Sequence, residues 1–284
     1  MAIKNTFPFK AVESKTLDIP VPLRRGIRWS VSMPGRVVFH EKWDLIPRKE
    51  AVFNLGSSYA QGEVEKAVLA NPNWEIAGTN STAASASRAT NGMLRLTTTT
   101  TSADSVILSP LSEATVLADG SNSGTYTSNI QATRWDTTKE PWARFQIRPE
   151  DVGTGTIWAG LKLTSVDTVA TDNDQAYFRI DVDAEEGEWD IVTSTGGSDE
   201  TAGTSIPYTA GKLYILDVYI DKDRYAHYGI SYLNSDGNIV SNWFRSTARV
   251  TNSLVTLKPF VGVKTGTAAE AILDVGEVVV SRLI

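Results

Sequence analysis

The chain has no cysteine and only two histidines among its 284 residues. Without cysteine, disulfides, thiolate nucleophiles and cysteine-ligated zinc sites are all excluded, so the fold must be stabilised by packing or by assembly with other chains. A serine triad would have to use His40 or His227, and no G-x-S-x-G elbow is present. Because H-E-x-x-H and phosphate-binding glycine loops are also missing, we expect no metal and no cofactor.

Long apolar runs are absent as well. The sequence has no stretch of about eighteen apolar residues that would cross a bilayer, and its first ten residues, MAIKNTFPFK, lack the apolar core of a secretory signal. We therefore expect a soluble protein without a membrane partner, assembled in a reducing cytoplasm.

Charge is unevenly distributed along the chain. The formal net charge is −6, but residues 1–70 carry 11 Lys and Arg against 7 Asp and Glu, whereas the remainder carries 16 against 26. A basic segment on an acidic body is able to steer association with an acidic protein surface, although ordinary surface charge explains the pattern equally well. The acidic body argues against nucleic acid as a partner.

Prolines punctuate the first part of the chain and predict an extended N-terminal arm. Proline fixes φ and removes an amide donor, so neither long helices nor central strands run through such a segment. Residues 61–70 have apolar positions at helical spacing and predict one short helix before Asn71-Pro72. We place the domain boundary there, with an anchoring arm at 1–70 and a β-sandwich at 71–284. The prolines of the arm are Pro8, Pro20, Pro22, Pro34 and Pro47.

From Met93 onward, short strand-like runs recur between clusters of Gly, Asp, Asn and Ser, which is typical of an all-β fold. We expect hairpin turns at 184–187 and 234–237, a surface loop or extended edge at 78–90, and a longer loop from Gly196 to Ser205. The expected strands are 93–99, 105–109, 129–135, 142–148, 156–163, 175–183, 188–194, 212–221, 225–233, 239–245, 254–264 and 270–282.

Two acidic segments carry residue types that suit a chemical site. Glu188-Trp189-Asp190 begins the E-x-D-x-x-E pattern of glucanases, but Thr193 stands where the second glutamate is needed, so a retaining mechanism lacks one of its two carboxylates. We expect no enzymatic activity. The run Asp172-Asn173-Asp174 offers oxygen ligands for calcium but fails the EF-hand pattern, so we interpret it as a turn capped by its own side chains.

Trp158 is a candidate contact residue. Ile157, Ala159 and Leu161 occupy the opposite strand face, which leaves Trp158 beside Gly160 and Lys162. If exposed, Trp158 would mark a ligand or subunit contact.

The order of motifs resembles the concanavalin A-like jelly-roll domains of structural proteins in tailed-bacteriophage virions. The resemblance covers about residues 71 to 284 and implies a two-sheet jelly-roll sandwich. The motifs are Trp74, GMLRL at 92–96, WAGL at 158–161, DNDQAYF at 172–178, Trp189, YILDVYID at 214–221 and LDVGEVVV at 273–280.

The resemblance implies a capsid decoration, or cement, protein on the virion surface. Its partner would be the major coat protein of a phage head, and the chain would assemble as a homo-oligomer, plausibly a trimer. Within the arm we expect Arg24, Arg25, Arg28 and Trp29 to contact the capsid, because Arg and Trp are favoured at interfaces. The alternative is a tail-fibre or receptor-binding, lectin-like module that recognises host polysaccharide.

Overall fold

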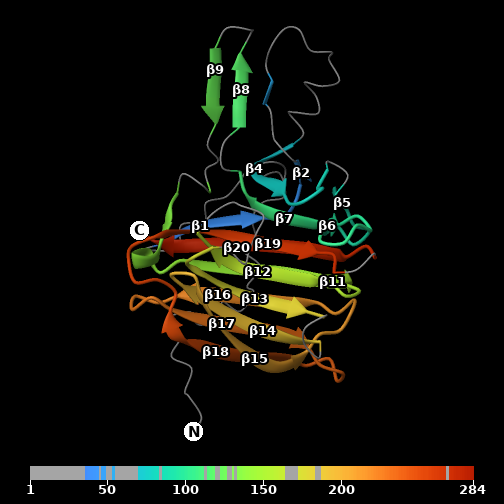
Figure 1. Cartoon of the computed structure of the whole chain (residues 1–284), viewed down its shortest axis with the longest axis vertical. Helices are drawn as coiled ribbons and strands as arrows, with labels where there is room; N and C mark the ends of the chain where they lie inside the picture. Colours follow the sequence, from blue (N-terminus) through green and yellow to red (C-terminus); the bar gives the residue numbers. More distant parts are fainter. Residues whose placement is uncertain are drawn as a thin grey trace, which may run out of the picture.

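The computed structural model describes residues 36–44, 46–48, 53–54, 70–82, 85–111, 114–118, 122–126, 130, 133–163, 172–182, 187–266 and 269–284. Two stacked sheets make up most of this part of the chain (Figure 1). Helical structure in the described residues is restricted to single-turn pieces such as the 3-10 turn η3 (Thr137–Lys139). None of the described helices is long and apolar enough to span a membrane. The expected all-β class is therefore confirmed.

The first sheet has eight strands. Its hydrogen-bonded order is β18 (Ile239–Arg249), β17 (Tyr225–Leu233), β16 (Tyr214–Ile220), β11 (Trp142–Asp151), β20 (Ile272–Leu283), β6 (Leu94–Thr97) and β5 (Ala86–Arg88), and β1 (Arg36–Glu41) also pairs with β20. All these pairings are antiparallel. The long strand β20 pairs through its first half with β6 and through its second half with β1.

The second sheet has nine strands. Its order is β15 (Ser198–Pro207), β14 (Glu188–Thr195), β13 (Gln175–Asp181), β12 (Thr156–Lys162), β19 (Thr256–Lys264), β7 (Ser105–Pro110), β4 (Ala70–Ala77) and β2 (Ile46–Arg48), with β10 (Trp135–Asp136) also on β19. A small third sheet consists of β3 (Phe53–Asn54), β8 (Ala114–Ala118) and β9 (Asn122–Tyr126). The β8–β9 hairpin projects beyond the sandwich (Figure 1).

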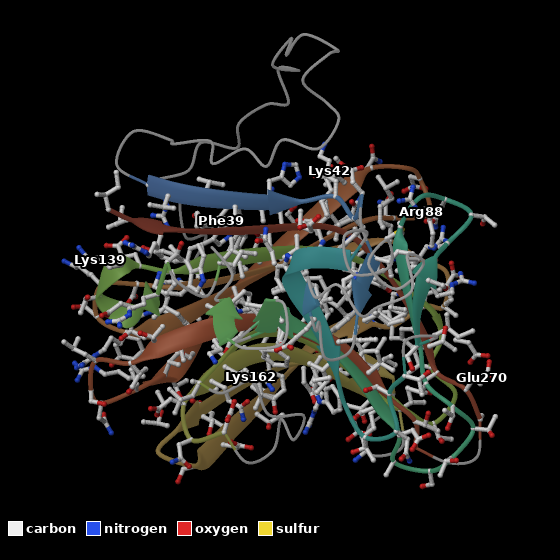
Figure 2. The ribbon with its side chains drawn as sticks, turned by 90° about the horizontal axis from the view of Figure 1, so that it is seen from above. Phe39, Lys42, Arg88, Lys139, Lys162 and Glu270 are labelled. Carbon is white, nitrogen blue, oxygen red and sulfur yellow. The ribbon has the colours of Figure 1, made fainter. Side chains whose placement is uncertain are left out.

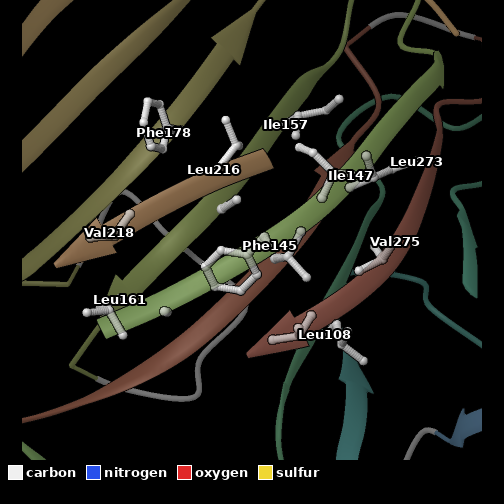
Figure 3. Packing of buried hydrophobic residues seen from close by; sticks show 14 of the residues in the cluster. Leu108, Phe145, Ile147, Ile157, Leu161, Phe178, Leu216, Val218, Leu273 and Val275 are labelled. Carbon is white, nitrogen blue, oxygen red and sulfur yellow. The ribbon is translucent and has the colours of Figure 1, made fainter. Parts of the chain in front are cut away.

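The core lies between the two large sheets and follows the alternation of the strands. On β16, the apolar face formed by Tyr214, Leu216, Val218 and Ile220 is fully buried. Figure 3 shows side chains of β11 and β16 packed in one layer with those of β12 and β13 from the opposite sheet. Because successive side chains of a strand point to opposite faces, every second residue of these strands is left for the outer surfaces.

One expected loop is a strand. Residues 198–207 form β15, which pairs with β14 along the sheet edge, and only Gly196 and Gly197, with φ of +58° and +83°, make the turn. The sequence reading failed because an edge strand with solvent on one side carries few apolar residues. Residues 78–90 were expected to form a surface loop or an extended edge, and they include β5 at the edge of the eight-stranded sheet. Of the strand expected at 129–135, Trp135 alone is in a strand among the described residues.

Residues 36–44 and 46–48 are built into the sandwich. β1 adds to the eight-stranded sheet and β2 to the nine-stranded sheet, and the blue strand β1 runs along β20 in Figure 2. The rings of Phe39 and Trp135 pack edge to face with their centroids 5.8 Å apart, and those of Trp43 and Trp74 do so at 5.7 Å. Residues 1–35 and 61–69, which hold most of the expected arm and its helix, lie outside the described residues.

Candidate functional site

The four capsid contacts expected from the sequence, Arg24, Arg25, Arg28 and Trp29, lie outside the described residues. Their role therefore stays a prediction.

Trp158 points away from the core, as expected, but its side chain is buried. It lies on the outer face of the nine-stranded sheet, between Arg179 and Gly262 on the neighbouring strands. The residue is only 8% exposed. It belongs to a second apolar cluster on that face, which contains Ile107, Trp158, Tyr177, Val192 and Phe260. The indole is therefore not an open stacking surface, and its role as a ligand or subunit contact stays a prediction.

The carboxylates of β14 do not form a glucanase constellation. Asp190 is buried and accepts a hydrogen bond from Arg179 at 2.9 Å. The next position on the same face is Val192, and Thr193 points into the sandwich, where its hydroxyl lies 2.7 Å from that of Tyr228. On this face of β14, Glu188 is therefore followed by Asp190, which is bound to Arg179, and then by the apolar Val192. This arrangement supplies no second free carboxylate for glycoside hydrolysis.

The acidic run at 172–174, expected to be a turn capped by its own side chains, bonds instead to the glycine turn at 196–197 and to Thr251. Asp174 accepts bonds from the amide of Gly196 at 3.0 Å and from the hydroxyl of Thr251 at 3.2 Å, and the Asn173 carbonyl accepts one from Gly197. Across the described residues, no group of three or more His, Cys, Asp or Glu is placed to hold a metal ion.

A site that the sequence analysis missed lies on the outer face of the eight-stranded sheet. Four residues stand in one row across four strands: Arg144 on β11, Asp217 on β16, Gly229 on β17 and Trp243 on β18. We call this row, together with Trp142, the Trp243 face. The indole of Trp243 lies over Gly229, because a Cβ atom built on that glycine would be 2.6 Å from the ring. Trp243 is nevertheless 37% exposed.

Arg144 and Asp217 form the polar centre of the Trp243 face. The guanidinium donates two hydrogen bonds to the carboxylate, at 2.8 and 3.0 Å, and the indole N–H of Trp142 donates a third at 2.9 Å. Arg144 also stacks over the Trp142 ring at 5.1 Å. Burial raises the pKa of the Asp217 carboxyl, although the bonds from Arg144 and Trp142 act in the opposite direction. Side chains locked in this way offer fixed hydrogen-bonding groups beside two aromatic rings.

A second polar cluster adjoins Trp243 along β18. The register between β17 and β18 shifts between Tyr225 and His227, so that Arg249 faces Tyr225 and Arg245 faces His227. Both guanidinium groups stack on the Tyr225 ring, at 4.1 Å for Arg245 and 5.9 Å for Arg249. A β-bulge of this kind re-aims side chains on the bulged strand, and here it directs two cations to one aromatic ring.

Asp221 is the carboxylate of this second cluster. It lies 2.8 Å from the ring nitrogen of His227 and 3.7 Å from the guanidinium of Arg245. Burial acts to raise the pKa of Asp221, but hydrogen bonds from His227 and from the Tyr225 amide outweigh burial and hold the pKa below its ordinary value. His227 is thus a half-buried residue of β17, and its ring is hydrogen-bonded to the Asp221 carboxylate.

Part of the Trp243 face was visible in the sequence. Along β11, Trp142, Arg144, Gln146 and Arg148 alternate with Ala143, Phe145 and Ile147, and the second set is fully buried. This alternation identifies an outward row of amphipathic residues. The contact between Trp243 and Gly229 gives no such signal, because it depends on the pairing register of two strands.

Comparisons with known proteins identify the fold. No family model matches the chain, and no curated protein matches it. Among solved structures, Arcelin-5, a lectin-like defense protein from Phaseolus vulgaris, aligns with a TM-score of 0.50 and 8% identity over 88% of this chain and 100% of that one. A lichenase, a β-1,3-1,4-glucanase derived from a mouse hindgut metagenome, aligns at 0.50 with 10% identity over 87% and 99%.

The chain has a concanavalin A-like jelly-roll fold. A protein of unknown function from Shewanella oneidensis MR-1 shares the same architecture, with a TM-score of 0.50 and 10% identity over 90% of this chain and 91% of that one. At such identities a concanavalin A-like likeness establishes the fold and leaves the function to be argued from the site. None of these three proteins is named as a virion protein, so the phage origin stays a prediction.

Proposed function

We propose that the chain is a non-enzymatic carbohydrate-binding module and that the Trp243 face is its binding surface. The observation that carries the proposal is the indole of Trp243, which is partly exposed and packs over Gly229. A sugar ring has an apolar face that stacks on an aromatic ring, and its hydroxyls need fixed donors and acceptors nearby. The Arg144–Asp217 pair in the same row supplies them.

The fold supports the same proposal. A lectin-like protein and a glucanase share this architecture. The comparisons therefore favour polysaccharide recognition, the alternative reading of the sequence, over capsid decoration. The arrangement of Asp190, Val192 and Thr193 on β14 favours binding over hydrolysis. We expect no release of reducing sugar when the chain is incubated with β-glucan.

A glycan array with the whole chain tests the proposal. We expect specific binding to at least one polysaccharide. Trp243→Ala should lower the affinity by about tenfold or more, because stacking of a sugar ring on the indole and burial of the indole together contribute about 1.4 kcal/mol or more to binding. The matched control is Leu254→Ala, which removes an exposed apolar side chain outside the strands. An array without any bound glycan, or equal binding by Trp243→Ala, would contradict the proposal.

Capsid decoration is the second candidate, and one observation favours it. β1 is paired in the eight-stranded sheet and β2 in the nine-stranded sheet, so a tether that precedes residue 36 would start from a paired strand. The proposed partner is the coat protein of a phage head, with contacts at Arg24, Arg25, Arg28 and Trp29. Deletion of residues 1–35 should then abolish binding to assembled heads. Retained binding at full affinity would refute this function.

A further inference from the structure

We infer that the ligand of the Trp243 face is an acidic polysaccharide, one with repeated carboxylate groups that bind Arg245 and Arg249 while a sugar ring stacks on Trp243. This inference rests on the proposed function and adds the class of glycan. It starts from the outward side chains of β18, where Trp243, Arg245 and Arg249 follow one another along the exposed edge of the eight-stranded sheet.

The two arginines are held in place before any ligand binds. Both guanidinium groups stack on the Tyr225 ring, and the carbonyl of Arg249 accepts a hydrogen bond from Thr195. The extra residues of the bulge, Thr247 and Ala248, bond to Glu200 on β15, which ties this end of β18 to the other sheet. Stacked arginines lose little side-chain entropy on binding, and this increases affinity for a ligand that they fit.

Charge around Tyr225 is opposite to that of the whole chain. The turn before β17 and the end of β18 hold the cations Lys222, Arg224, Arg245 and Arg249, against the carboxylates of Asp221, Asp223 and the bulge-bound Glu200. Asp221 is already engaged by His227. Arg245 keeps a side chain that is 52% exposed, although it lies 3.7 Å from Asp221. A local excess of positive charge on a chain of net charge −6 attracts an anionic ligand to this surface.

The shape of the surface favours carboxylates on sugar rings over phosphates on nucleic acid. A guanidinium forms paired hydrogen bonds with a planar carboxylate, and the neighbouring indole provides a flat apolar surface for a pyranose ring. Nucleic acid would need a broad basic surface, whereas the cations here are confined to the end of β18 and the turn before β17. A polymer of uronic acids carries both required groups in each repeat.

Calorimetric titration of the whole chain tests the inference. The acidic probes are polygalacturonate and alginate, the neutral probe is dextran, and the polyphosphate probe is double-stranded DNA. We expect at least one acidic polysaccharide to bind about tenfold or more tightly than dextran and DNA. Arg245→Gln and Arg249→Gln should each weaken that binding by about tenfold, the effect of losing a charge-assisted hydrogen bond. Added salt should weaken it as well.

Controls separate the inference from the proposed function. Lys264→Gln removes a positive charge from β19 of the other sheet and should leave binding unchanged. If dextran binds as tightly as the acidic probes and only Trp243→Ala weakens binding, the proposed carbohydrate-binding function is supported and the inference of an acidic ligand is overturned. DNA binding equal to that of the acidic probes also overturns it. If none of these saccharides binds and the glycan array is also empty, both the proposed function and the inference are refuted.

Discussion

The hydroxyl of Thr193, on one sheet, lies 2.7 Å from the hydroxyl of Tyr228, on the other. Tyr228 also donates a hydrogen bond to the carbonyl of Val192 at 2.8 Å, so these groups satisfy one another inside the core. Thr193 is the position at which the glucanase pattern needs its second glutamate. Here that position faces inward and links the two sheets, which explains structurally why the strand carries no catalytic pair.

Removing the Tyr228 hydroxyl should destabilise the sandwich. In Tyr228→Phe, Thr193 and the Val192 carbonyl lose their bonds in a buried environment, so we expect the free energy of unfolding to fall by about 2 kcal/mol. Urea unfolding measures the change. Tyr232→Phe is the control, because its half-buried ring stays stacked with Lys212, and we expect a change of less than about 0.5 kcal/mol. Equal losses in the two variants would contradict the prediction.

A methyl group at Gly229 should displace Trp243 without unfolding the strand. In Gly229→Ala the added carbon would overlap the far edge of the indole, whereas alanine is tolerated in a strand as well as glycine or better. We expect a stability change within about 1 kcal/mol, a shifted indole N–H signal of Trp243 in NMR spectra, and weaker glycan binding. Ser231→Ala, at the next outward position of β17, should change neither signal nor binding. An unshifted indole signal in Gly229→Ala would refute this contact.

The cost of removing Arg144 should depend on pH. The folded-state pKa of Asp217 is already raised by burial, and Arg144 opposes that rise, so Arg144→Ala should raise it further. A carboxyl with a raised folded-state pKa contributes most stability when protonated, and loses this contribution as the pH rises through that pKa. We therefore expect a cost of about 3 kcal/mol at pH 7 and a smaller one at pH 4.

Urea unfolding at the two pH values measures this cost. The control is the double variant Arg144→Ala with Asp217→Asn, compared with Asp217→Asn alone. The titrating group is absent from both, so the cost of Arg144→Ala should no longer differ between pH 4 and pH 7. The same cost of Arg144→Ala at both pH values would show that Asp217 does not carry the effect.

The position of an N-terminal truncation should decide whether the sandwich survives. Deleting residues 1–35 leaves β1 and β2 in place, whereas deleting residues 1–55 removes both strands together with the buried side chains of Val38 and Trp43. Burial of one tryptophan alone is worth about 5 kcal/mol at about 25 cal/mol per Å². Thermal unfolding should show a stable shorter truncation and a strongly destabilised longer one. Equal stability of the two would mean that β1 contributes nothing to the fold.

Much of the fold was predictable because strand patterns are local. The alternation in β16 and β11 follows directly from the two faces of a strand. The turn at 234–237 was predictable because Asn234 bonds the amides of Asp236 and Asn238, and Gly237 adopts a φ of +76°. β15 was not predictable, since its exposed edge carries no apolar alternation. The alternation of residues 36–43 predicts a strand, as found in β1. The prolines around β1 and β2 nevertheless place both strands in an arm, because their partner strands lie elsewhere in the chain.

The sequence by itself determined the all-β class, the face of each long strand that enters the core, and the missing carboxylate on β14. These properties depend on neighbouring residues and on the two-residue period of a strand. Only the tertiary structure decided that Trp158 is buried, that Trp243 rests on Gly229, and that Arg245 and Arg249 share one tyrosine ring. Those contacts depend on strand order, register and one bulge, which are set by the packing of the whole sandwich.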